Sequence, residues 1–113
     1  MNAVIRIERF PNHSIREFHV NRVISDSPRE SFDRPLRKRS EEYLKKIGKL
    51  GARLVRAALR LPGVTEVGIY PYTFRVKISL AHNWESVEES IIRLLKREVF
   101  PGVDPSAVQV SNI

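Results

Sequence analysis

Residues 64–80, VTEVGIYPYTFRVKISL, form the segment that decides the fold. From residue 73 onward, polar and apolar side chains alternate, which is typical of a strand with one buried face. We expect this strand to bury Phe74, Val76, Ile78 and Leu80. A second strand is predicted from residue 64 onward, and Tyr70-Pro71-Tyr72 predicts the turn of a hairpin with the Tyr72 ring packed inward.

A helix is predicted on the N-terminal side of this hairpin, over residues 40–61. Its apolar residues recur at helical spacing, and Pro62-Gly63 ends it. Ser40 has the position and chemistry of an N-cap. Gly51 falls on the apolar face, where we expect a close approach by another segment of backbone.

A second helix is predicted on the C-terminal side of the hairpin. It begins at an Asn83 cap and extends to about residue 99, with Trp84 in the core. Before the first helix, alternating segments at 3–10 and 15–24 predict two more strands.

The remaining segments are predicted to be irregular or peripheral. Residues 25–39 predict a polar loop that Phe32 anchors in the core, and residues 107–110 predict a short edge strand. The order ββαββα indicates an α+β sandwich, with a four-stranded, mostly antiparallel sheet and both helices on one face. We expect a single domain over residues 1–113, with a core at about 3–100 and a C-terminal tail at 101–113.

The net charge of +7 is concentrated in one part of the chain. Residues 34–60 hold ten Lys or Arg against two Glu, whereas the other residues hold ten basic and eleven acidic side chains. On a continuous helix, five basic residues fall within an arc of roughly 80° that barely overlaps the apolar face: Lys45, Lys49, Arg53, Arg56 and Arg60. The predicted partner-binding residues are Arg37, Lys38, Arg39, Lys45, Lys49, Arg53, Arg56 and Arg60.

Three interpretations fit this basic segment: a solvated helix face, a docking surface for an acidic protein partner, and a sequence-nonspecific nucleic-acid-binding surface. The chain has no RRM, KH, zinc-finger or helix-turn-helix signature. Phe18 and Phe74 alternate toward the core and not onto a stacking surface. We therefore favour the acidic protein partner and keep nucleic acid as the alternative. A membrane partner is not expected, because the apolar face is needed for the core.

The chain contains no cysteine, which excludes disulfides and thiolate ligation of zinc or of an iron–sulfur cluster. The three histidines lack a metal-binding spacing, and no phosphate-binding or nucleophile motif occurs. We therefore expect a non-catalytic protein without a cofactor. A metal-ligating role for His19, on the predicted open face of the sheet, needs partners that the sequence does not place beside it. The N-terminal residues lack a signal-peptide pattern, so we expect a cytoplasmic protein.

Two stretches resemble the Nfu-type NifU N-terminal domain family. The first is RFPNHSIREFHVNRVIS at 9–25, and the second is LVRAALRLPGVTEVGIYPYTFRVKISLAHNWESVEESI at 54–91. Their order and spacing carry the resemblance, since each matching residue is a turn or core residue. The family-motif positions include Pro11, Asn12, Phe18, Pro62, Gly63, Val64, Tyr72 and Trp84.

The resemblance implies a role in iron–sulfur cluster biogenesis. In multidomain members of the family, a separate C-terminal C-x-x-C domain holds the cluster, and this chain resembles the stand-alone versions without that domain. It would then be a small accessory or protein-interaction domain, docking components of iron–sulfur cluster assembly through its basic helix face.

Overall fold

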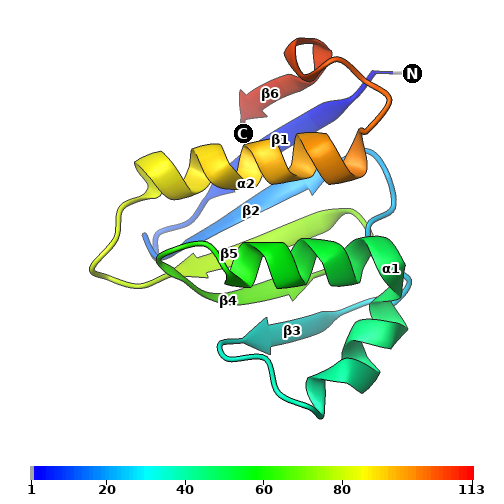
Figure 1. Cartoon of the computed structure of the whole chain (residues 1–113). Helices are drawn as coiled ribbons and strands as arrows, with labels where there is room; N and C mark the ends of the chain where they lie inside the picture. Colours follow the sequence, from blue (N-terminus) through cyan, green and yellow to red (C-terminus); the bar gives the residue numbers. More distant parts are fainter. Residues whose placement is uncertain (1) are drawn as a thin grey trace.

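The hairpin at residues 64–80 supplies two neighbouring strands of a larger sheet. In the computed structural model, which describes residues 2–113, β4 (Val64–Ile69) pairs antiparallel with β5 (Thr73–Ile78). The sheet has six strands in the order β3-β4-β5-β2-β1-β6 (Figure 1). The remaining strands are β1 (Val4–Arg9), β2 (Ile15–Val20), β3 (Glu30–Asp33) and β6 (Gln109–Asn112).

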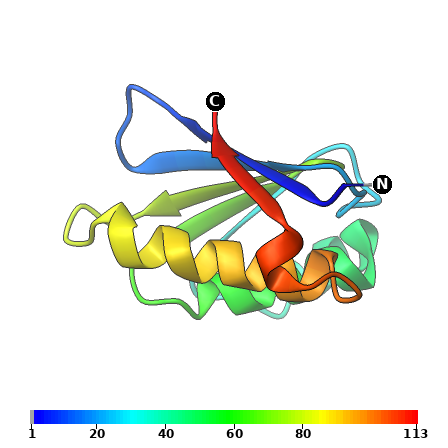
Figure 2. The same ribbon diagram turned by 90° about the horizontal axis from the view of Figure 1, so that it is seen from above.

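Two helices cover one face of this sheet and leave the other face open (Figure 2). They are α1 (Ser40–Leu59) and α2 (Trp84–Val99), and the core lies between them and the strands. Its largest fully buried side chains include those of Phe18, Phe74 and Phe100. The predicted α+β class and the helices on a single face are therefore confirmed. Among the described residues, no helix combines the length and apolar character needed to cross a membrane.

The predicted sheet of four strands is wrong, because β3 and β6 extend it to six. β3 lies inside the polar segment 25–39 and pairs antiparallel with β4; only Phe32 of its four residues is buried, so no alternation marks it. β6, close to the short strand predicted at 107–110, pairs parallel with β1. The sheet is therefore mixed.

The predicted ends of the first helix need two corrections. Ser40 is the first residue of α1 and not its N-cap, since Arg39 occupies that position without a side-chain hydrogen bond. The Ser40 hydroxyl instead accepts from the backbone N–H of Arg37 at 3.1 Å. At the other end α1 stops at Leu59, and Gly63 makes the following turn with a φ of +91°.

α1 is broken at Gly48, where the backbone has φ 89° and ψ 172° and not helical values. The break frees the carbonyl of Ile47 from the helix, and this carbonyl accepts from the backbone N–H of Asp26 at 3.0 Å. One turn later, a Cβ on Gly51 would lie 2.8 Å from the carbonyl oxygen of Ile24. The close backbone approach expected at Gly51 is therefore confirmed, and the segment 24–26 lies in a notch between the two glycines.

Three side chains test the predicted packing of the second half of the chain. Leu80 is 97% exposed, since β5 ends at Ile78 and the chain turns toward α2. Tyr72 is 52% exposed in the hairpin turn, so both inward orientations were wrong. Trp84 is buried as predicted, and its indole Nε1–H donates to the carbonyl of His13 at 2.6 Å. The Asn83 cap is also confirmed, because its side chain accepts from the backbone N–H of Glu85.

We predict that Gly51→Ala destabilises the protein by about 1–3 kcal/mol, because the added methyl group would meet the carbonyl of Ile24. Helix propensity alone predicts the opposite sign, with alanine favoured over glycine by about 1 kcal/mol. Urea unfolding of both proteins measures the difference. Gly102→Ala is the control, since no atom lies within 4 Å of its added Cβ. A stabilised Gly51→Ala variant would contradict the close approach.

Candidate functional site

The predicted basic residues do not form one stripe along one helix. Arg37, Lys38 and Arg39 lie in the loop before α1, and Lys45 precedes the break at Gly48. The projection at 100° per residue assumes a continuous helix, so it does not relate Lys45 to the residues after the break. Lys49, Arg53, Arg56 and Arg60 belong to the second, regular part of α1 and its C-cap.

Two of these residues form ion pairs with glutamates of the same chain. Arg53 Nε lies 2.8 Å from Glu98 Oε1 on α2, and Arg56 Nη2 lies 2.8 Å from Glu41 Oε2 in the first turn of α1. The hydrogen bond from Arg53, followed by the one from Arg97, lowers the pKa of Glu98 below its ordinary value. Within residues 2–113, the other six predicted residues are exposed and form no ion pair: Arg37, Lys38, Arg39, Lys45, Lys49 and Arg60.

A groove lies between the loop at 34–36 and the C-terminal half of α1, and we call it the basic groove. It combines three arginines with three apolar residues, and its lining consists of Arg34, Pro35, Leu36, Arg56, Leu59 and Arg60. The Arg34 guanidinium is held in place, since its Nη1 donates to the carbonyl of Val64 at 3.1 Å. The basic residues of this groove stand out in the sequence as part of the charge excess at 34–60. Its apolar lining was not predictable, because it forms only when the loop folds back onto α1.

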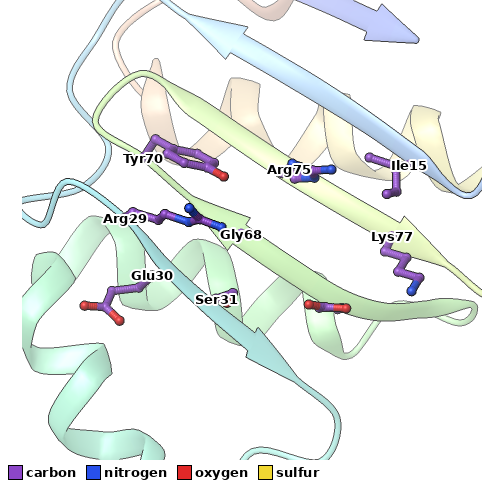
Figure 3. Close-up of a pocket in the computed structure, with 9 residues that line it drawn as sticks. Ile15, Arg29, Glu30, Ser31, Gly68, Tyr70, Arg75 and Lys77 are labelled. Atoms are coloured by element: carbon purple, nitrogen blue, oxygen red, sulfur yellow. The ribbon is translucent and has the colours of Figure 1, made fainter. Parts of the chain in front are cut away.

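The open face of the sheet carries a shallow hollow over β3, β4 and β5 (Figure 3). Gly68 lies within it and has no side chain to fill it, while the side chains of Arg29 and Tyr70 lie nearby. Both signs of charge line it, from Arg29, Arg75 and Lys77 and from Glu30 and Glu66. The hollow is therefore a polar surface of mixed charge.

Beside the hollow, the structure gives His19 the partners that the sequence did not reveal. Its Nε2 lies 2.8 Å from Oε1 of Glu8 on β1 and 3.8 Å from Oε1 of Glu17 on β2. Its Nδ1 lies 2.8 Å from the hydroxyl of Thr73 on β5. Arg75 extends from the hollow toward this group, with Nη1 3.6 Å from Glu17 Oε2. These residues come from three strands, β1, β2 and β5, and the pairing of the strands brings them together.

Solved structures show which known fold this chain shares. No family model and no curated protein matches the sequence. The solution structure of a NifU-like protein from Saccharomyces cerevisiae superposes with a TM-score of 0.66 at 18% identity, over 87% of this chain and 79% of the other. The chain has a NifU-like fold. The crystal structure of protein SAV1430 from Staphylococcus aureus superposes with a TM-score of 0.60 at 16% identity, over 84% of this chain and 99% of the other.

The residues that carried the family resemblance lie in the core or in the turns of this NifU-like fold. Phe18, Val64 and Trp84 are buried in the core. Asn12 Oδ1 accepts from the backbone N–H of Ser14 at 3.0 Å, which shapes the turn between β1 and β2. Pro11, Pro62, Gly63 and Tyr72 lie in connections between elements. None of these motif residues lines the basic groove.

We predict that Glu98→Gln lowers stability at pH 7 by up to about 1 kcal/mol, because the substitution removes a partly exposed ion pair with Arg53. The folded-state pKa of Glu98 lies below the ordinary 4.5. Its contribution is therefore fully present above pH 4.5 and is lost as the pH falls through the lower folded value. Urea unfolding at pH 7 and at about pH 3 tests this. Glu89→Gln is the matched control, since its pair with Arg93 is 68% exposed on both sides. An equal loss for Glu98→Gln at both pH values would contradict the prediction.

Proposed function

We propose that this protein is a non-catalytic interaction domain that binds an acidic segment of a protein partner in the basic groove, and that it serves iron–sulfur cluster assembly. The observation that carries the proposal is the groove itself, in which arginines border an apolar lining next to a loop with three exposed basic side chains. Each part of the proposal has its own support and its own test.

The choice of an acidic protein segment follows from the lining of the groove. Leu36 and Pro35 offer aliphatic contacts to an apolar side chain, while Arg34 and Arg60 lie beside them for carboxylates. No aromatic residue is among the six lining residues, so the groove lacks the stacking surface that single-stranded nucleic acids use. The exposed side chains of Arg37, Lys38 and Arg39 continue the positive charge along the loop and favour encounter with an acidic partner.

The link to iron–sulfur cluster assembly rests on two likenesses. The sequence resembles the Nfu-type NifU N-terminal domain family, and the fold is that of a NifU-like protein. With no cysteine, the chain offers no thiolate to a cluster, so the role that fits is an accessory one. Deletion of the gene for this protein from cells that express it should lower the activities of iron–sulfur enzymes. Unchanged activities would remove this part of the proposal and leave the groove intact as a binding site.

We predict that a fluorescent decapeptide of alternating Glu and Leu binds the purified protein, and that Arg37→Glu/Lys38→Glu/Arg60→Glu raises its Kd about 10-fold or more. None of these three side chains forms an ion pair within residues 2–113, so the substitutions leave the internal contacts in place. Fluorescence anisotropy at about 50 and 200 mM salt measures both proteins.

The matched control is Arg9→Glu/Lys77→Glu/Lys96→Glu, which makes the same charge change at residues that belong neither to the groove nor to the loop before α1. The control should bind the peptide almost as the parent does. If both triple variants bound the peptide equally weakly, net charge alone would explain the loss of affinity. A labelled 20-mer oligonucleotide is measured alongside. Tight binding that collapses with salt and with the Arg37/Lys38/Arg60 substitutions, without peptide binding, would establish the nucleic-acid alternative instead.

A further inference from the structure

We propose that Glu8, Glu17 and His19 form a binding site for a first-row divalent transition-metal ion such as Zn²⁺, with one coordination position open to solvent. The three residues offer two carboxylate oxygens and one imidazole nitrogen that all lie within 4.8 Å of one another. The site lies on the open face of the sheet, so it is separate from the basic groove beside α1. It does not depend on the function proposed above.

The register of the sheet places two like charges together. Glu8 on β1 and Glu17 on β2 are direct cross-strand partners, and like charges in such positions repel each other. His19 follows Glu17 by two residues and therefore projects from the same face. A bound cation between the carboxylates would turn this repulsion into attraction.

The distances between the ligand atoms suit a metal ion that binds nitrogen and oxygen at about 2.0–2.2 Å. Ligand atoms around tetrahedral Zn²⁺ stand about 3.4 Å apart. His19 Nε2 lies 2.8 Å from one oxygen of Glu8 and 3.8 Å from one oxygen of Glu17, which brackets that separation. Small rotations of the two glutamate side chains are enough to complete the coordination, and both side chains are partly exposed.

A third strand orients the imidazole. The Thr73 hydroxyl lies 2.8 Å from His19 Nδ1, and an Nδ1–H that donates to it leaves the Nε2 lone pair directed at the two carboxylates. Partners of this kind fix the tautomer and ring orientation of metal-binding histidines. In the metal-free protein, the tautomer with Nε2–H can instead donate to Glu8, and a metal ion would take the place of that hydrogen.

The charges around the site set the kind of ion and the strength of binding. One imidazole and two carboxylates suit zinc and related borderline ions better than magnesium, which prefers oxygen ligands alone. Arg75 contacts the second oxygen of Glu17 and holds this carboxylate in place, while Arg6 is the cross-strand partner of His19. Because these two cations oppose a further positive charge, we expect a Kd of about 1–100 μM.

The test is isothermal titration calorimetry of the full chain with ZnCl2, after a chelator has removed bound metal. We expect one equivalent of Zn²⁺ to bind and to raise the melting temperature by mass action, and Mg²⁺ at the same concentration to do neither. Glu8→Gln and His19→Gln should each weaken binding at least about 10-fold, and Thr73→Val should weaken it about 10-fold without removing a ligand. All three proteins are compared by circular dichroism before titration.

The matched controls are Glu66→Gln and His82→Gln, which remove the same chemical groups outside the cluster. They should bind Zn²⁺ as the parent does. Binding that survives both Glu8→Gln and His19→Gln, or no binding by the folded parent, would overturn the proposal. The peptide-binding variant Arg37→Glu/Lys38→Glu/Arg60→Glu should keep full Zn²⁺ affinity, so failure here and failure of the proposed function are separate results.

Discussion

The fit of the segment 24–26 into the notch of α1 is the contact on which much of the structure depends. Gly48 and Gly51 make room for it, and the carbonyl of Ile47 accepts from the backbone of Asp26. On its other side the segment is tied to the hairpin turn, since the backbone N–H of Ile24 donates to the carbonyl of Pro71 at 2.8 Å. One short stretch of chain therefore joins α1 to the β4–β5 hairpin. The segment 24–26 packs at the break in α1 at Gly48, and this break changes the course of the helix between Lys45 and Lys49. The same contact therefore affects where the basic residues lie.

The two faces of the sheet divide the chemistry of the protein. Both helices cover one face and bury the apolar side chains, so the other face is free to carry charged residues. Arg75 connects the two groups found there, since it lines the hollow around Gly68 and also contacts Glu17. The basic groove lies apart from both, between α1 and the loop that follows β3. A partner in the groove and an ion on the open face would therefore not compete for the same residues.

The elements with strong periodicity could be predicted from sequence, whereas those with little burial were missed or predicted only in part. The alternation at 73–78 and the helical spacing after residue 40 predicted β5 and α1, and the position of Gly51 predicted its close approach. β3 has one buried residue, produced no hydrophobic pattern and was missed. β6 has no buried residue, and the sequence predicted only a short edge strand at 107–110, without its partner. The cluster around His19 was out of reach for another reason. Its members come from three strands, and only the register of the pairing shows that Glu8 and Thr73 flank the same ring.

The parallel pairing of β6 with β1 has a consequence for how the chain is made. Val4 pairs with Gln109 and Ile7 with Asn112, so the outer edge of β1 is closed by residues that are synthesised about a hundred positions later. A ribosome adds about 5–20 residues each second, and β1 therefore waits several seconds with one edge unpaired. During that interval the exposed edge can pair with another nascent chain. When β6 pairs with β1, it closes that edge and becomes the edge strand of the sheet itself, with only four residues.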